Sequence, residues 1–66
     1  MKDTEALETL VKCAGNQRKL AAIVGISETH ISRMLNGVYP VPTYLVALGE
    51  AMAALPPRDW PERWRT

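Results

Sequence analysis

Apolar residues along the chain recur at intervals of three and four positions, the spacing that places side chains on one face of an α-helix. This pattern predicts four helices, at about residues 4–13, 17–24, 28–36 and 43–55. The residues expected to face inward are Leu7, Leu10, Val11 and Ala14, then Leu20, Ile23 and Val24, then Ile31, Met34 and Leu35, and finally Leu45, Leu48, Met52 and Leu55. No segment alternates with the two-residue period of a β-strand, so the expected fold class is all-α, a compact bundle of four to five helices.

Capping residues mark the ends of these helices. Asn16 and Ser27 precede the second and third helices, where a side-chain oxygen accepts a hydrogen bond from a free amide of the first turn. Gly15, Gly25 and Gly37 follow the first three helices, where glycine tolerates the left-handed backbone that ends a helix. The helix boundaries are therefore predicted from local chemistry as well as from periodicity.

Length and cysteine content restrict the class of protein. The 66 residues have room for one domain, expected to span residues 1–66 with its core at 4–55. A domain of this size buries only about 60% of the surface of its unfolded chain, so its core is thin. Cys13 is the only cysteine, which excludes an intrachain disulfide and a cysteine–histidine zinc cluster and favours a cytoplasmic location. No apolar run approaches the roughly 20 residues that cross a bilayer, and the first residues lack a signal-peptide pattern.

The tail, residues 56–66, begins with two prolines that stop the last helix. Asp59 and Glu62 have the spacing of a capping box and predict one short final turn of helix. The two tryptophans of the tail leave two alternatives open. They fold back to complete the core, or they join the last helix in a homodimer interface. The candidates for that interface are Val46, Ala53, Trp60 and Trp64.

Charge is unevenly distributed along the chain. The formal net charge of the chain is +1. The net charge is −2 over residues 1–11, +3 over residues 12–44 and zero over residues 45–66. The positive excess lies in the segment that contains the second and third helices. A local excess of this kind favours a polyanionic partner.

The second and third helices carry the most informative pattern. They are short and separated only by residues 25–27, where Gly25 permits a positive φ and a steep change of direction. Placing Ile31 inward puts Thr29, Arg33 and Asn36 on the opposite side of the third helix. A stripe of hydroxyl, guanidinium and amide groups suits base edges and phosphates.

The segment 17–37, QRKLAAIVGISETHISRMLNG, resembles the helix-turn-helix of the Cro and lambda-repressor-like DNA-binding proteins of phages and bacteria. The resemblance is carried by Gln17 at the opening, Ala21 at the small position, Gly25 at the turn and the apolar residues Leu20, Val24, Ile26, Ile31 and Met34. The LNG ending, followed by the proline-rich residues 40–42 and a helix, is also similar to small YdaS-like regulators. The resemblance therefore covers about residues 5–55.

The resemblance implies a sequence-specific, double-stranded-DNA-binding transcriptional regulator, most simply a repressor or autorepressor of a phage, mobile-element or anti-CRISPR operon. It implies a homodimer on an inverted-repeat operator, with residues 28–36 as the recognition helix in the major groove. The implied base contacts are Glu28, Thr29, Ser32 and Arg33. The implied phosphate contacts are Gln17, Arg18, Lys19, Asn36 and Tyr39. Among these, Arg33 is the foremost base reader, as a bidentate donor to guanine.

A protein-interaction module, such as a DNA-binding antitoxin that neutralises a partner protein, is the alternative favoured by the low net charge. No nucleophile, base and oxyanion hole assemble in the sequence, so no enzymatic activity, cofactor, metal or small-molecule substrate is expected. An enzyme that uses Cys13 or His30 is the remaining alternative. The expected location is the cytoplasm of a bacterium or phage-infected host, at the nucleoid when bound to DNA and without a membrane partner.

Overall fold

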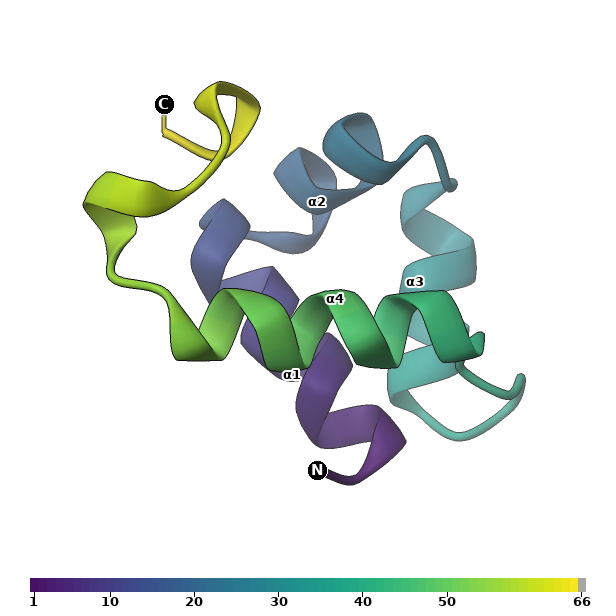
Figure 1. Ribbon diagram of the computed structural model, residues 1–66. Helices are drawn as coiled ribbons and strands as arrows, with labels where there is room; N and C mark the ends of the chain where they lie inside the picture. Colours follow the sequence, from purple (N-terminus) through teal and green to yellow (C-terminus); the bar gives the residue numbers. More distant parts are fainter. Residues whose placement is uncertain (66) are drawn as a thin grey trace.

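Four α-helices follow one another in the computed structural model, which describes residues 1–65 (Figure 1). They are α1 (Asp3–Ala14), α2 (Gln17–Val24), α3 (Glu28–Leu35) and α4 (Thr43–Ala54), followed by the 3₁₀ turns η1 (Pro57–Asp59) and η2 (Glu62–Trp64). No strand occurs within residues 1–65, so the predicted all-α class is confirmed. The longest helices have 12 residues, and none of the helices described is long and apolar enough to cross a membrane.

The capping residues lie at the helix ends that the sequence predicts. The Asn16 side chain accepts a hydrogen bond from the Lys19 amide at 2.8 Å, and the Ser27 hydroxyl accepts one from the His30 amide at 3.1 Å. Gly25 has φ of 75°, in the left-handed region, and ends α2. The second and third helices are therefore fixed at both sides of the turn that joins them.

The core lies where α4 crosses α1 and where α2 and α3 pack against α1 and against each other (Figure 1). The buried apolar side chains of the core are Leu7, Leu10, Ala14, Leu20, Ile31, Met34, Val41, Leu45, Met52 and Trp64. Five of the residues expected to face inward are only half-buried and pack at the margin of this cluster, namely Val11, Ile23, Val24, Leu35 and Leu48.

Gly49 sets the distance between α1 and α4. It is buried in the middle of α4, and a Cβ atom at this position would lie 2.6 Å from the Ala6 carbonyl oxygen. Ala6 itself has no exposed surface. Two backbones approach this closely only where the side chains between them are absent or very small, so Gly49 and Ala6 form the crossing point of the two helices.

Leu55 does not belong to the core, although the helical period places it on the inward stripe. Its side chain is 41% exposed, and its backbone is extended with φ of −104° and ψ of 139°. Pro56 follows directly, and the residue before a proline is disfavoured in the helical conformation. The helix therefore ends at Ala54 and Leu55 leaves its stripe.

The tail contains two 3₁₀ turns where the capping-box spacing predicted a single helical turn. Asp59 ends η1, and η2 begins at Glu62 without a side-chain cap, so the predicted capping box is wrong. The reason is the extended backbone of Trp60 and Pro61, which separates the two acidic residues into different turns. Thr66, the last residue of the expected tail, lies outside the described residues.

The tail is anchored to the helices by its aromatic and basic side chains. Trp64 is 6% exposed and packs into the core, the position described by the first alternative for the tail. An Arg63 guanidinium nitrogen donates to the Ile23 carbonyl at the end of α2 at 3.2 Å. The half-buried Trp60 donates its indole N–H to the Leu55 carbonyl at 3.2 Å. The tail therefore covers one end of the core.

Replacing Gly49 by alanine is expected to lower the free energy of unfolding by about 1–3 kcal/mol, because the new methyl group overpacks the contact with Ala6. Ala51→Gly, at an exposed position of the same helix, is the matched control and should cost about 0.5–1 kcal/mol through helix propensity alone. Urea unfolding followed by circular dichroism measures both. A more stable Gly49→Ala protein, as propensity alone requires, would contradict the close crossing.

Trp64→Ala is expected to lower the free energy of unfolding by about 3–5 kcal/mol, because it removes a large side chain from a small core. Trp60→Ala should cost less than half as much, since Trp60 is only half-buried. Thermal and urea unfolding of both variants provide the comparison. Equal losses for the two tryptophans would show that Trp64 has no special place in the core.

Candidate nucleic-acid interface

Five polar side chains from two helices line one open groove with a volume of about 370 Å³. Four come from α3 and are the residues implied as base contacts, namely Glu28, Thr29, Ser32 and Arg33. The fifth is Gln17, the first residue of α2. Residues from two different helices therefore form one polar surface, which lines this groove.

The packing of α3 determines which of its faces borders the groove. Ile31 and Met34 have no exposed surface and fix the inner face of α3 against the core. Leu20, also without exposed surface, anchors α2 in the same way. Because successive helical residues are rotated by 100°, the face of α3 opposite these apolar anchors is turned to solvent, and Glu28, Thr29 and Arg33 are exposed there. The polar groove is therefore a consequence of the hydrophobic register.

The turn between α2 and α3 holds the two helices at a fixed angle. The amides of Gly25 and Ile26 both donate to the Ala21 carbonyl, at 2.9 and 3.2 Å. Ser27 then caps α3 through its hydroxyl. These contacts satisfy the backbone groups at the end of one helix and the start of the next. Gln17 of α2 thereby lines the same groove as the α3 residues.

The groove contains one acidic and one basic side chain, and both are exposed. Within residues 1–65, the one ion pair joins the N-terminal amine to Glu50, at 3.4 Å and on a different helix. Glu28 and Arg33 are thus not neutralised by partners in the described chain. The guanidinium of Arg33 retains its donors for an external acceptor.

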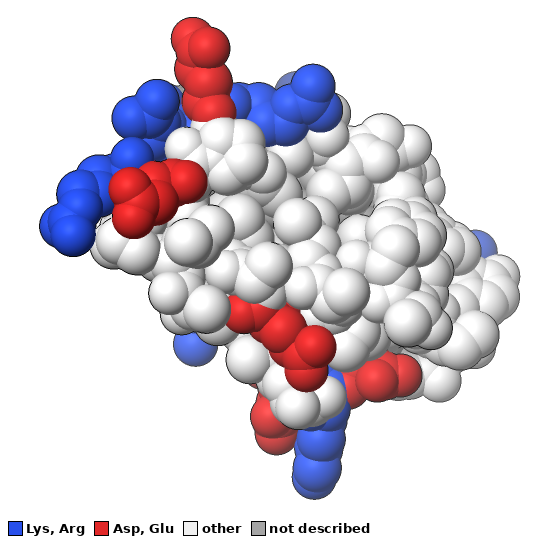
Figure 2. Space-filling view, in the orientation of Figure 1, with Lys and Arg blue, Asp and Glu red and all other residues white. Residues whose placement is uncertain are grey.

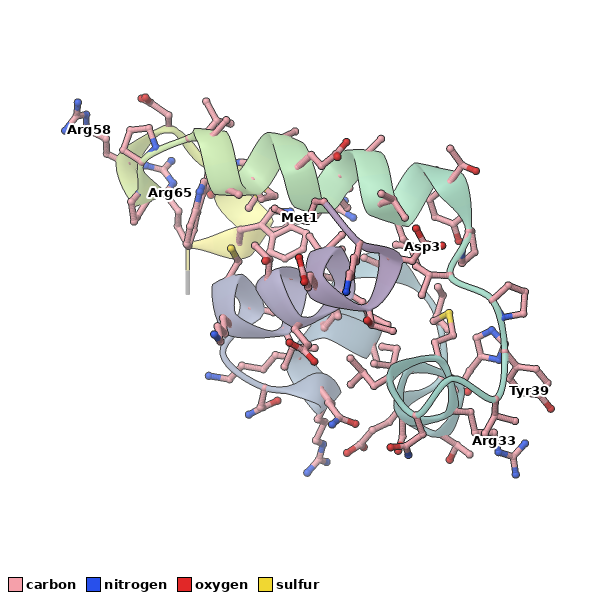
Figure 3. All side chains as sticks on the ribbon, turned by 90° about the horizontal axis from the view of Figure 1, so that it is seen from below. Met1, Asp3, Arg33, Tyr39, Arg58 and Arg65 are labelled. Carbon is pink, nitrogen blue, oxygen red and sulfur yellow. The ribbon has the colours of Figure 1, made fainter. Side chains whose placement is uncertain are left out.

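Tyr39 contacts the groove-lining helix from the connector between α3 and α4. Its ring stacks on the His30 ring with centroids 5.1 Å apart and an interplanar angle of 24°. The Arg33 guanidinium carbon lies 6.0 Å from the Tyr39 ring centroid, and the two side chains project from the same end of the molecule (Figure 3). A cation at this distance is attracted to the face of the ring, so Tyr39 restrains Arg33.

The backbone after α3 explains how Tyr39 returns to that helix. Gly37 has φ of 78°, and its amide donates to the Met34 carbonyl at 3.1 Å, while the Val38 amide donates to the Arg33 carbonyl at 2.9 Å. This left-handed ending reverses the chain. Sequence reasoning missed the His30–Tyr39 contact, although the signal was present as an aromatic residue just beyond a helix-ending glycine.

The remaining implied phosphate contacts lie outside the groove. Arg18, Lys19 and Asn36 are exposed, and none of them lines it. The stem of Lys19 lies over Gly15, and Lys19 and Arg63 border a separate hollow of about 310 Å³. The structure therefore brings Gln17 together with the α3 residues, while Arg18, Lys19 and Asn36 lie outside the groove.

The four candidates for a dimer interface do not share one degree of exposure. Ala53 is exposed, Val46 and Trp60 are half-buried against the core, and Trp64 is buried. Trp64 leaves almost no surface for a second molecule in this conformation.

Other reactive groups are few in the described chain. Burial raises the pKa of the half-buried Cys13 thiol, which lowers its thiolate content at neutral pH. No group of three or more His, Cys, Asp or Glu side chains suited to a metal ion occurs among residues 1–65.

Comparisons of the chain with protein-family models, curated proteins and solved structures find no significant match.

Replacing Tyr39 by leucine is expected to remove the ring current that Arg33 and His30 experience in the free protein. The side-chain proton resonances of Arg33 should then move downfield, because in the wild type they lie over the face of the aromatic ring, where the ring current shields them. Tyr39→Phe should keep the wild-type shifts, and Tyr44→Leu, which removes a tyrosine outside the cluster, is the control. Proton NMR of the three variants tests the contact. Unchanged Arg33 and His30 resonances in Tyr39→Leu would contradict it.

Proposed function

We propose that this chain is a sequence-specific DNA-binding regulator of transcription that inserts α3 into the major groove of double-stranded DNA. The observation that carries the proposal is the polar groove formed by Gln17 and the α3 residues Glu28, Thr29, Ser32 and Arg33. The resemblance of residues 17–37 to Cro and lambda-repressor-like proteins supports it. Repression is the simplest outcome, because a bound protein occludes an overlapping promoter without catalytic chemistry.

The dimensions and chemistry of α3 suit the major groove. The major groove is about 12 Å wide, and an α-helix with its side chains is about 10–12 Å in diameter. Arg33 would donate two hydrogen bonds to the O6 and N7 atoms of guanine, and Glu28 would accept from a cytosine amine. The hydroxyl groups of Thr29 and Ser32 serve either as donors or as acceptors.

Contacts to DNA phosphates would come from residues in and near the polar groove of the protein. Gln17 begins α2 beside the α3 face, so insertion of α3 brings its amide to the adjacent sugar–phosphate strand. Arg18 and Asn36 are exposed at the first turn of α2 and the end of α3, and Lys19 provides a further cation. Contacts of this kind hold the register of the protein on the duplex, whereas the α3 residues read the sequence.

Two copies would be needed for useful selectivity. The eight residues of α3 reach only a few base pairs, whereas two copies related by a two-fold axis read an inverted repeat. Their α3 helices would then enter successive major grooves about 34 Å apart, or multiples of that distance. We propose a homodimer on such an operator, in the cytoplasm of a bacterium or phage-infected host, with an operon of a phage or mobile element as its target.

Arg33→Ala is expected to weaken binding to the selected duplex by about 5–150-fold, the loss of one bidentate base contact worth about 1–3 kcal/mol. Arg58→Ala is the matched control, because it removes the same charge from the end of the molecule farthest from Tyr39 (Figure 3). Duplexes selected from a random library supply the probe, and fluorescence anisotropy with unrelated competitor DNA measures selectivity.

Wild-type affinity is also expected to fall steeply as salt rises, because phosphate contacts release counterions. Equal selectivity of Arg33→Ala and the wild type would remove Arg33 from the base contacts. Failure of the wild type to select any duplex would favour the protein-interaction module.

A further inference from the structure

Large apolar side chains are exposed at the end of the molecule that carries Tyr39. Val38 is 63% exposed, Tyr39 is 40% exposed and Tyr44 is 61% exposed, and all three lie on the connector or the first turn of α4. We call these three residues the connector patch. Exposed apolar clusters on small proteins mark interaction surfaces, and tyrosine is enriched at such surfaces.

The charge pattern of the connector patch suits contact with a second copy. Residues 34–49 contain no Lys, Arg, Asp or Glu. In Figure 2 the charged side chains gather near the tail and near the N-terminus, while the surface over the start of α4 is almost entirely uncharged. A two-fold axis places a patch against its own copy, so any charge in it would meet a like charge. The side chains of the connector patch itself carry no charge and avoid that repulsion.

The position of the patch relative to α3 also suits a dimer that reads one duplex. Figure 3 shows α4 along one side of the molecule, Arg33 projecting on the opposite side and Tyr39 at the edge between them. Two copies that present α3 to the same duplex must be related by an axis along the direction in which α3 faces. Contact through the outer face of α4 would turn the two α3 helices away from each other. Contact at an edge of the molecule leaves both α3 helices on the same side of the dimer, where one duplex can contact both.

The two ends of the long axis of the molecule offer two such edges, the connector end and the tail end. The length of the molecule distinguishes contact at one from contact at the other. The molecule is 33 Å in its longest dimension, and Arg58 and Arg65 of the tail lie at the end opposite Tyr39 (Figure 3). Because α3 is next to the connector, contact between connector patches keeps the two α3 helices within about one molecular length, so this contact allows half-sites one turn of duplex apart, at about 34 Å, and no wider spacing. Contact between tails would place them nearly two molecular lengths apart.

We infer that the connector patch joins two copies of this chain side by side on an operator whose half-sites are one helical turn apart. The inference rests on the proposed function, which supplies the need for two copies. The exposed parts of Val38, Tyr39 and Tyr44 amount to a few hundred Å², well below the roughly 800 Å² per partner of a standard stable interface. The copies therefore meet weakly in free solution and assemble on DNA.

The double variant Val38→Ser/Tyr44→Ser tests the inference and leaves Tyr39 in place, because Tyr39 also contacts Arg33 and His30. Binding is measured to a selected duplex with two half-sites and to one with a single half-site. The variant should bind the two-site duplex about tenfold more weakly than the wild type and lose cooperativity. Its affinity for the single half-site should stay within about twofold of the wild type. Leu55→Ser, which alters an exposed apolar residue outside the patch, is the matched control.

The possible outcomes separate the two proposals. A wild type that selects no duplex would overturn the proposed function and with it assembly on DNA. A wild type that selects half-sites two turns apart, or a double variant that stays cooperative, would overturn the connector patch alone. Loss of cooperativity in Leu55→Ser but not in the double variant would place the contact elsewhere.

Cross-linking gives a readout that does not depend on affinity. Val38→Cys in a Cys13→Ala background should form an intermolecular disulfide under mild oxidation, because a residue near a two-fold axis faces its own copy. The yield should rise in the presence of the two-site duplex. Ala53→Cys in the same background is the control and should cross-link poorly. Equal yields for the two variants with the duplex would contradict the inference.

Discussion

The burial of one face of α3 is the constraint from which the candidate site follows. Ile31 and Met34 are fully enclosed by the core, and this register fixes which α3 side chains remain in solvent. Rotating the helix would expose these two apolar side chains and bury a guanidinium and a carboxylate, each at a large cost in free energy. The hydrophobic contacts on one side of α3 thereby determine the orientation of Glu28 and Arg33 on the other side.

The burial of α3 depends in turn on the close packing of the other helices around a small core. The backbones of α1 and α4 meet at Ala6 and Gly49, and this close crossing lets Leu7, Leu10 and Leu45 reach the same cluster as the α3 residues. The tail adds the ring of Trp64 to that cluster. A larger side chain at the crossing would separate the helices and weaken the support of α3.

The sequence predicted those features that depend on neighbouring residues. Caps such as Asn16 and Ser27 are local, and the predicted helix bounds agree with the structure to within one residue. The error at Leu55 arose from following the helical period into the residue before a proline, where local backbone sterics override periodicity. The error in the tail arose because the extended backbone at Trp60 splits what looked like one capping box.

Contacts between residues separated by a turn could not be derived in the same way. Helical spacing alone places Thr29 and Arg33 on one face, but it does not place Gln17 of a different helix beside them. The resemblance of residues 17–37 implied a phosphate contact for Gln17 and base contacts for the α3 residues, and the structure shows that these side chains line one groove. The contact of Tyr39 with His30 depends on a chain reversal whose direction is set by the hydrogen bonds after α3, and periodicity does not encode it.

A net charge of only +1 shapes how such a protein would find its site under the proposed function. Non-specific affinity for DNA comes from phosphate neutralisation, so a chain with few excess cations binds random duplex weakly. Glu28, which lines the polar groove of the protein, would strengthen this effect. Its carboxylate is repelled by DNA phosphates unless a base offers it a hydrogen-bond donor. Weak non-specific binding raises the ratio of specific to non-specific affinity, on which selection of a site among many competitors depends. Under that function, the affinity lost in this way would be recovered by a second copy on the same duplex, and self-association would then be coupled to base reading in this small fold.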